Sequence, residues 1–532
     1  MGIDGLISFR CGRGKRALRG LHLDSRTRSH VTLRSPPPDR FYNQEMVHDA
    51  VIGHWWLPGK EAARVPGSLD FGARFANLSL IGSLEPASDI VGIASLFPEP
   101  PAYRVVFGRE IIPDREITIF GASGSAVPNF SPSNPAPRQD LDLEGTILFG
   151  CHLADRSLPV VSTMTARLFN LGYWLGARSE LRQRETSATD PSRTVASLET
   201  NSPKIEAIEI REGTSLQFFF TYFESAVYGA EGAVLSLADD GAAQFSYETP
   251  ATLDEAEGDV ALLAGLVTFF SGATSWVQSQ VVTLGGDSSR IEVWRGGRPD
   301  FEVPKNLGQR AVLHSTQIEL SSVVAKWFEL HQGAGRVGVN VLQAHHFKAD
   351  QYVETGFLAA VTALDVLYRV LSTGRERELP VKQEANPDLV STVATARAAL
   401  SPQFHSALKR TGETKTSLLR KLQYLLAWIG PQQFAAVVQV DKQASWTNLT
   451  KDVRNSIAHE GDFAAHVDSS GLLGLQLQVR WLLKLAILKH LGVSDDLLVE
   501  ATVHSEEGRS ASYTFRYLPA MKSESQIGLA TK

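Results

Sequence analysis

Residues 447–461, TNLTKDVRNSIAHEG, carry the pattern around which the rest of the chain can be organised. Apolar residues recur there at every fourth position, at Leu449, Val453 and Ile457, which is the spacing of the buried stripe of an amphipathic helix. Gly461 comes after the last of them, and a glycine at that place commonly ends a helix. The stretch therefore predicts a short helix that packs against other helices.

Three polar residues lie along one edge of this predicted helix. Asn455 and His459 are four residues apart and share a face, and Arg454 lies about 100° round from Asn455. A guanidinium can bind a phosphate through two parallel hydrogen bonds, and an imidazole can transfer a proton near neutral pH. The three residues are therefore candidates for chemistry on a phosphodiester. The alternative, which composition alone favours, is a pair of surface residues at a helix end.

Helical periodicity extends to both sides of this stretch and predicts a bundle. Apolar residues at helical spacing recur in three further segments, 353–370, 417–431 and 471–492. Asp365 is a further candidate for the site, or else a surface ion-pair partner of Arg369 one turn later. Arg420 and Lys421 are candidates for binding phosphates, or else belong to a solvated helix face.

The chain before residue 321 has a different pattern. Short runs with alternating apolar residues are separated by Gly and Pro, as half-buried strands are. Among these runs are YRVVFG (103–108), EITIFG (116–121), TILFGCHL (146–153) and SLQFFFTYF (215–223). The predicted fold class is α+β with several domains: a β-rich N-terminal domain over residues 46–320, then an all-α bundle over residues 321–497.

Two terminal segments lie outside these predicted domains. Residues 1–45 hold nine Lys and Arg against four Asp and Glu, and we expect a basic disordered tail. A transit peptide, or a start codon placed too far upstream, would have a similar composition. Residues 498–517 alternate around Gly508, so residues 498–532 are predicted to form a C-terminal β-hairpin and a tail.

The composition limits the class of protein. The chain has 532 residues, 43% hydrophobic and 21% charged, with a net charge of −6, which suits a folded soluble protein of two or three domains. Its two cysteines, Cys11 and Cys151, are too few for a disulfide framework or a zinc cluster, which fits the reducing cytoplasm. Residues 260–286 contain no charged side chain, and we expect a buried helix running into a strand rather than a membrane span.

Two adjacent aromatic residues, Trp55 and Trp56, stand in the run GHWWLPG (53–59). On a strand edge, one would lie in the core and the other on the surface. The alternative is a stacking pair that binds a sugar, which leaves a carbohydrate-binding β-domain open.

The chain resembles a known family in both halves. GHWWLPG (53–59), VPGSL (65–69), LSLIGSL (78–84) and EITIF (116–120) resemble the N-terminal domain of ApeA-type anti-phage proteins. RNSIAH (454–459), late in a helical region and before a long apolar helix, resembles the R-polar-x-x-x-H motif of HEPN ribonucleases.

This resemblance implies a function. It implies a metal-independent endoribonuclease without cofactors that acts in the bacterial cytoplasm, cleaves RNA (with tRNA the expected substrate) and stops growth on infection. It assigns the catalytic motif to Arg454, Asn455 and His459, and it places Asp365 where related sequences commonly carry Glu. It also implies a homodimer through the HEPN domain, no membrane contact, and an N-terminal domain that senses a phage-derived trigger. The competing interpretation is a non-catalytic HEPN module for dimerisation or RNA binding, under a β-domain that senses a ligand or a carbohydrate.

Overall fold

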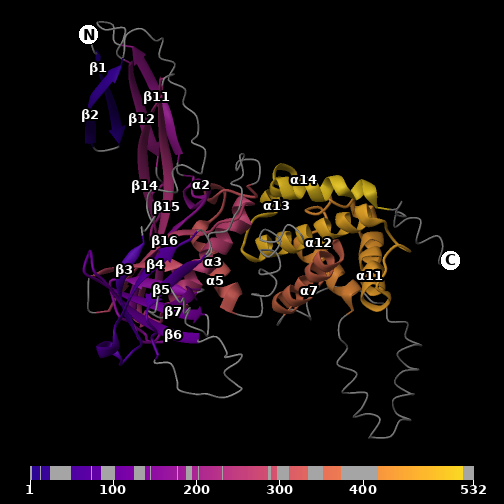
Figure 1. Ribbon diagram of the computed structural model, residues 1–532. Coiled ribbons are helices and arrows are strands. Elements are labelled where there is room, and N and C mark those ends of the chain that lie inside the picture. Colours follow the sequence, from indigo (N-terminus) through magenta and orange to yellow (C-terminus); the bar gives the residue numbers. More distant parts are fainter. Residues whose placement is uncertain are drawn as a thin grey trace, which may run out of the picture. The chain divides into compact units, whose positions relative to one another are not determined.

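A computed structural model (Figure 1) shows two compact units, residues 1–306 with 314–317 and residues 307–313 with 318–532. The residues that it describes are 3–11, 14–23, 50–72, 75–85, 102–124, 138–143, 145–176, 178–186, 194–201, 203–229, 232–285, 289–295, 311–332, 352–372 and 417–518. Each unit is described by itself below.

The first unit is built on one antiparallel sheet of thirteen strands, part of which closes into a barrel. Strands β7, β6, β3, β4, β5 and β8 follow one another, and β8 pairs again with β7 through Ala122 and Leu143. The barrel strands are β3 (Val51–Trp56), β4 (Val65–Phe71), β5 (Ala76–Ile81), β6 (Ala102–Glu110), β7 (Arg115–Gly124) and β8 (Arg138–Leu143). Closure removes the free edges of these six strands.

The barrel interior is filled by apolar side chains at alternating strand positions. Leu69, Leu78 and Ile119 are fully buried there, and so is Trp55 on β3. Trp55 pairs across the strands with Gly108 of β6, and its indole ring covers that glycine. A β-carbon added at Gly108 would lie 2.3 Å from the ring, so the close approach depends on the glycine.

Gly108→Ala should therefore destabilise the first unit by about 1–3 kcal/mol, because an added methyl group must displace a fully packed indole ring. Gly258→Ala is the matched control: Gly258 lies in a helix with no atom within 4 Å of its would-be β-carbon. That change should stabilise the protein by about 0.5–1 kcal/mol. Thermal unfolding followed by near-UV circular dichroism measures both. Equal melting temperatures for the two variants would contradict the packing described.

The remaining strands extend the sheet beyond the barrel, in the order β9, β17, β16, β10, β15, β14, β13 from the side of β7. Their bounds are β9 (Thr146–Phe149), β10 (Val161–Leu168), β13 (Ile208–Arg211), β14 (Thr214–Gly229), β15 (Gly232–Ala251), β16 (Val277–Leu284) and β17 (Arg290–Arg295). Helix α3 (Leu253–Ser271) packs on β10, β15 and β16 and is buried over most of its length. The uncharged segment 260–286 is thus a buried helix running into strand β16, as predicted.

Helix α3 has clear sequence signals at both ends. The Thr252 hydroxyl accepts from the Glu255 backbone N–H, and the Glu255 carboxylate accepts from the Thr252 backbone N–H, which is a complete capping box. Gly272 ends the helix with φ 65°. A short helix, α2 (Leu171–Trp174), and a 3₁₀ turn, η1 (Glu61–Ala63), complete this part of the unit.

Two further hairpins belong to the first unit. β1 (Ile3–Cys11) pairs with β2 (Gly14–Leu23), and β11 (Arg178–Thr186) pairs with β12 (Thr194–Asn201). The predicted disordered tail over residues 1–45 is therefore wrong for residues 3–11 and 14–23. Alternating apolar residues such as Leu21 and Leu23 favour a strand, and the count of basic residues obscured them. Figure 1 also shows the long β14–β15 hairpin extending away from the barrel.

The second unit is a helical bundle. Its helices are α5 (Leu320–Gln332), α7 (Val353–Ser372), α10 (Leu418–Ile429), α11 (Gln443–Glu460), α12 (Ser469–His490), α13 (Asp495–His504) and α14 (Glu506–Tyr513). Short 3₁₀ turns η4 (Val440–Lys442) and η5 (Thr514–Tyr517) lie before α11 and after α14, and η3 (Ser315–Gln317) belongs to the first unit. The predicted α+β class, a β-rich region followed by a helical bundle, is confirmed.

Helix α12 lies at the centre of the bundle and contacts α7, α10, α13, α14 and η5. Among the described residues it is the one helix long and apolar enough to cross a membrane by length and composition, with a mean hydropathy of 1.3. In the structure, 89% of that apolar window is buried inside the protein. Such burial is that of a core helix.

The predicted C-terminal hairpin is wrong. Residues 498–517 form the end of α13, α14 and η5. Serines precede both helices at the N-cap position, and the Ser505 hydroxyl accepts from the Gly508 N–H at 3.1 Å. Gly508, expected at a hairpin turn, lies inside α14. A β-carbon there would lie 2.3 Å from the Thr502 carbonyl oxygen, so the glycine permits close packing of the two helices.

Candidate active site

Helix α11 presents the candidate catalytic residues at its C-terminal end. Gly461 ends the helix with φ 72°, and its N–H donates hydrogen bonds to the carbonyl oxygens of Ser456 and Ile457. Asn455 and His459 are exposed and Arg454 is half-buried. The Arg454 guanidinium donates to the Asn455 amide oxygen at 3.2 Å. The three side chains thus lie on the accessible edge of the helix, as their spacing predicts.

The buried stripe of α11 differs from the predicted one. Val453 is fully buried as expected, but Leu449 and Ile457 are half-buried. The fully buried positions include Trp446 and Thr450. The Thr450 hydroxyl donates to the Trp446 carbonyl at 2.8 Å, and this bond lets a polar residue enter the core.

Asp365 of α7 and Lys421 of α10 form an ion pair beside this edge. Asp365 also accepts from Arg369 at 2.8 Å, so the predicted surface pair exists alongside. The Lys421 side chain is only 12% exposed. Burial lowers the pKa of Lys421, and the positive charge of Arg454 lowers it further. Three helices therefore bring a carboxylate and two cations into one electrostatically coupled cluster.

The two predicted phosphate-binding residues have different positions. Lys421 belongs to the cluster, whereas the Arg420 side chain is exposed on another part of the α10 surface. Two aromatic residues that periodicity did not mark as functional pack together, and one of them lies near Lys421. Its ammonium lies 5.8 Å from the centroid of the Tyr368 ring, which meets the Tyr424 ring edge-on at 5.0 Å. The sequence signal that could have marked this contact was Tyr368, an aromatic residue three positions after Asp365.

Metal ligands do not gather in the described part of the chain: no group of three or more His, Cys, Asp or Glu side chains there could hold an ion. The metal independence of the chemistry stays a prediction.

The tryptophan pair of the first unit does not form a stacking platform. Trp55 is fully buried in the barrel and Trp56 is only 3% exposed. Trp56 packs edge-on against His152 at 5.3 Å, and the Arg64 guanidinium covers it at 4.7 Å. The prediction that one of the two rings lies on the surface is therefore wrong. The alternative of a sugar-binding stacking pair is wrong for the same reason, because it also needs an exposed ring. Trp55 faces the barrel interior, and Trp56 is buried on the other face of β3, where Ile52 and His54 are exposed.

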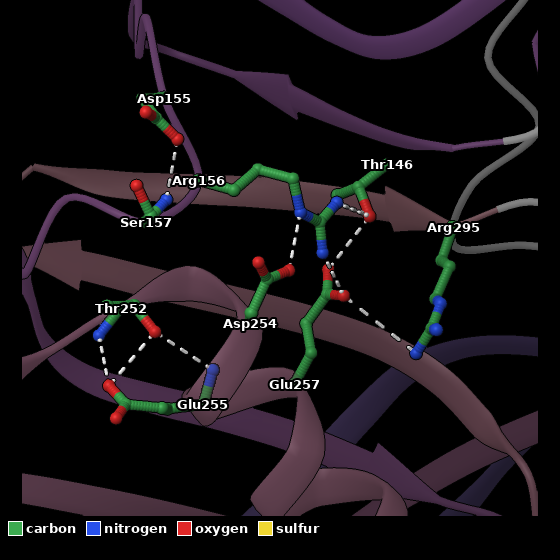
Figure 2. Close-up of polar contacts among 9 residues, drawn as sticks. All are labelled: Thr146, Asp155, Arg156, Ser157, Thr252, Asp254, Glu255, Glu257 and Arg295. Carbon is green, nitrogen blue, oxygen red and sulfur yellow. Dashed lines mark hydrogen bonds and ion pairs between the residues drawn. The ribbon is translucent and has the colours of Figure 1, made fainter. Parts of the chain in front are cut away.

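A partly buried ion network in the first unit ties a loop to α3 and the sheet (Figure 2). Arg156 donates to Asp254 at 2.6 Å, to the Thr146 hydroxyl at 2.8 Å and to Glu257 at 2.7 Å. Arg295 lies 3.9 Å from Glu257 on its other side. Burial lowers the pKa of Arg156, but the two carboxylates outweigh it and raise the pKa above its ordinary value. The network is fully paired, which is typical of a structural clamp.

An open pocket of about 570 Å³ lies beside this network. Four consecutive residues of β6, 102–105, line it, in the part of β6 before its pairing with β3 at residues 107–110. Residues 154–157 form the opposite wall. The Asp155 carboxylate there accepts from the Ser157 N–H, which lowers its pKa, and Arg104 contributes in the same direction.

A closed β-barrel with an extended sheet, joined in one chain to a helical bundle with an Arg–Asn…His edge, defines a two-domain HEPN protein. Comparison with known families gives the particular family. The chain matches ApeA N-terminal domain 1 over residues 50–302 and the Apea-like HEPN domain over residues 358–497. These matches together cover more than half of the chain, which therefore belongs to the ApeA-type HEPN proteins. No curated protein and no solved structure matches it.

The family supports a nuclease or RNA-binding role in defence. HEPN domains are typically ribonucleases, and they generally bind RNA and dimerise. The HEPN match includes Asp365, Lys421 and the whole of α11.

Proposed function

We propose that this protein is a metal-independent endoribonuclease of bacterial anti-phage defence that cleaves RNA, with tRNA the expected substrate. One observation carries the proposal: Arg454, Asn455 and His459 share the accessible edge of one helix. The Asp365–Lys421 pair lies beside them. An imidazole, an amide and a guanidinium meet the needs of phosphodiester cleavage.

RNA supplies its own nucleophile, the ribose 2′-hydroxyl. His459 removes the proton from this hydroxyl, and the 2′-oxygen attacks the adjacent phosphorus. The bond from phosphorus to the 5′-oxygen breaks, and that oxygen leaves with a proton. The products are a 2′,3′-cyclic phosphate and a 5′-hydroxyl.

The other residues act on charge and position. Arg454 stabilises the negative charge that accumulates on the phosphorane, and Asn455 holds the guanidinium in place through their hydrogen bond. Lys421 is paired with Asp365, so this pair adds little net charge and acts on the position of the neighbouring side chains. Asp365 already pairs with two cations, Arg369 and Lys421, and its side chain is shorter than the Glu expected at this place. We therefore assign it a positioning role.

The assembly is proposed to be a cytoplasmic homodimer. One α11 helix provides one imidazole on one side of a phosphate, and a second copy would supply the acid for the leaving oxygen. The first unit is proposed to be the sensor of a phage-derived trigger and the second the ribonuclease.

Cleavage should continue in EDTA and leave 2′,3′-cyclic phosphate or 3′-phosphate ends, because the proposed chemistry uses only side chains and the 2′-hydroxyl. Purified protein is incubated with total RNA with and without chelator, and product ends are read by sensitivity to a 3′-phosphatase. Activity lost in EDTA and restored by a divalent ion would contradict the mechanism. RNA binding without cleavage would identify a non-catalytic HEPN module.

A further inference from the structure

An exposed aromatic stack lies at the end of α14 and in the η5 turn. The Arg516 guanidinium carbon lies 3.3 Å from the centroid of the Tyr513 ring and 4.8 Å from that of the Tyr517 ring. Arg516 also donates to the Tyr517 hydroxyl at 2.7 Å. The two rings meet edge-on with centroids 6.1 Å apart. The Arg516 guanidinium thus lies against both rings, whose planes are inclined to each other by 74°.

The two rings and the guanidinium face solvent. Tyr513 is 57% exposed and Tyr517 is 43% exposed, and Arg516 is exposed as well. Large aromatic residues usually bury most of their area, so two of them exposed around one cation need a reason. The stack contributes little to the core, because its members make their closest described ring contacts with each other.

The backbone beneath the stack is held firmly on α12. The Thr514 carbonyl oxygen would lie 3.1 Å from a β-carbon at Gly474, and the Tyr517 carbonyl oxygen 3.3 Å from one at Gly471. Leu518 is buried just after the turn. The two glycines therefore let η5 approach α12 closely, which fixes the position of the stack.

Resting on the ribonuclease proposed above, we propose that Tyr513, Arg516 and Tyr517 form a platform that binds single-stranded RNA. Unpaired bases stack on aromatic rings and on guanidinium planes, whereas bases in a duplex cannot. Arg516 keeps N–H donors beyond the one on Tyr517, and these can bind a phosphate. Lys442, 5.7 Å from the neighbouring Phe515 ring, adds positive charge next to the platform. The platform belongs to the same compact unit as Arg454 and His459.

The test uses the full-length chain with His459→Ala, so that RNA stays intact during binding. Fluorescence anisotropy measures binding of a labelled, mixed-sequence single-stranded oligoribonucleotide and of the same strand in a duplex. Tyr513→Ala and Tyr517→Ala should each weaken single-strand binding about tenfold, while Tyr513→Phe should keep it, because stacking needs the ring and not the hydroxyl. Arg516→Ala should also reduce the salt dependence of binding: the slope of log affinity against log salt concentration should become shallower by about 1, the value expected for one lost phosphate contact.

Tyr352→Ala is the matched control. Tyr352 lies just before α7 in the same unit and is 82% exposed, and no cation stacks on it among the described residues. Its loss should leave RNA binding unchanged. All of these variants should melt within about 2 °C of the parent, since the side chains are exposed.

The outcomes separate this proposal from the ribonuclease itself. If the tyrosine variants bind single strands as tightly as the parent, or if duplex binding weakens to the same extent, the platform is rejected even where the wild-type protein cleaves RNA. If the wild-type protein cleaves nothing but the tyrosine variants bind single strands more weakly, the platform stands and the ribonuclease proposal fails.

Discussion

His459→Ala should lower the rate of RNA cleavage by a factor of about 10²–10⁴, while the helical unit stays folded. The imidazole is the proposed base, and it is exposed in the last turn of α11. Arg454→Ala should lower the rate by about 10²–10³, because one donor to the phosphorane is lost. Cleavage of total RNA is followed on gels, and toxicity is followed in overexpressing or infected cells.

The matched control for this result is Val453→Asp, one residue from Arg454. Val453 is fully buried, so a carboxylate there enters the core without a partner, and the unit should lose more than about 4 kcal/mol of stability. The two catalytic variants should instead melt within about 2 °C of wild type. If His459→Ala melts as early as Val453→Asp, His459 is structural and the catalytic assignment fails. A folded and fully toxic His459→Ala variant would make the HEPN domain a binding module.

Glu507→Leu should destabilise the helical unit by about 3 kcal/mol, the lower end of the range for a broken buried pair. Lys484 of α12 is only 3% exposed, and its ammonium contacts the Glu507 carboxylate at 2.7 Å, while Glu507 keeps 31% exposure. Burial lowers the pKa of Lys484, the carboxylate raises it, and nearby Arg480 lowers it again. Without Glu507, the buried Lys484 loses this carboxylate, while the charge of Arg480 still opposes its protonation. Thermal unfolding should show a melting temperature lower by roughly 6–12 °C.

Two companion variants make this result specific to burial. Lys484→Met combined with Glu507→Leu should recover much of the loss, because two apolar side chains can replace a buried pair. Asp495→Asn in α13 removes the partner of Lys489, a more exposed lysine of α12, and should cost less than about 1 kcal/mol. If Glu507→Leu costs no more than Asp495→Asn, the buried pair has no special role in stability.

Local signals were sufficient to predict four helices of the bundle, α7, α10, α11 and α12. Ser417 caps α10, Gly430 and Gly461 end α10 and α11, and Asp468 caps α12. Each of these acts within one turn of its own helix, so it can be read from neighbouring residues. The stripe of α11 was misplaced because Thr450 bonds a carbonyl of its own helix and becomes a core residue, which a count of apolar positions cannot detect.

The features that depend on distant residues could not be predicted. Closure of the barrel rests on the pairing of β7 with β8, and the burial of Trp56 rests on His152 and Arg64. The chain order says nothing about either contact. Likewise, the edge of α11 was predicted from spacing, but the approach of Lys421 to Arg454 needed the packing of α10 on α11.

The helical residues after 497 determine where the HEPN domain can be cut without damage to its fold. The family match stops at residue 497, inside α13, whereas the folded bundle continues to residue 518. The segment beyond the match supplies the Thr502 hydroxyl that accepts from the Trp481 indole at 3.0 Å, and the carboxylate that meets Lys484. A chain ended at the family boundary would lack the acceptor of the Trp481 indole N–H and the carboxylate that contacts the Lys484 ammonium. The folded HEPN domain is therefore longer than its sequence signature, and functional dissection of the two units should keep these last helices.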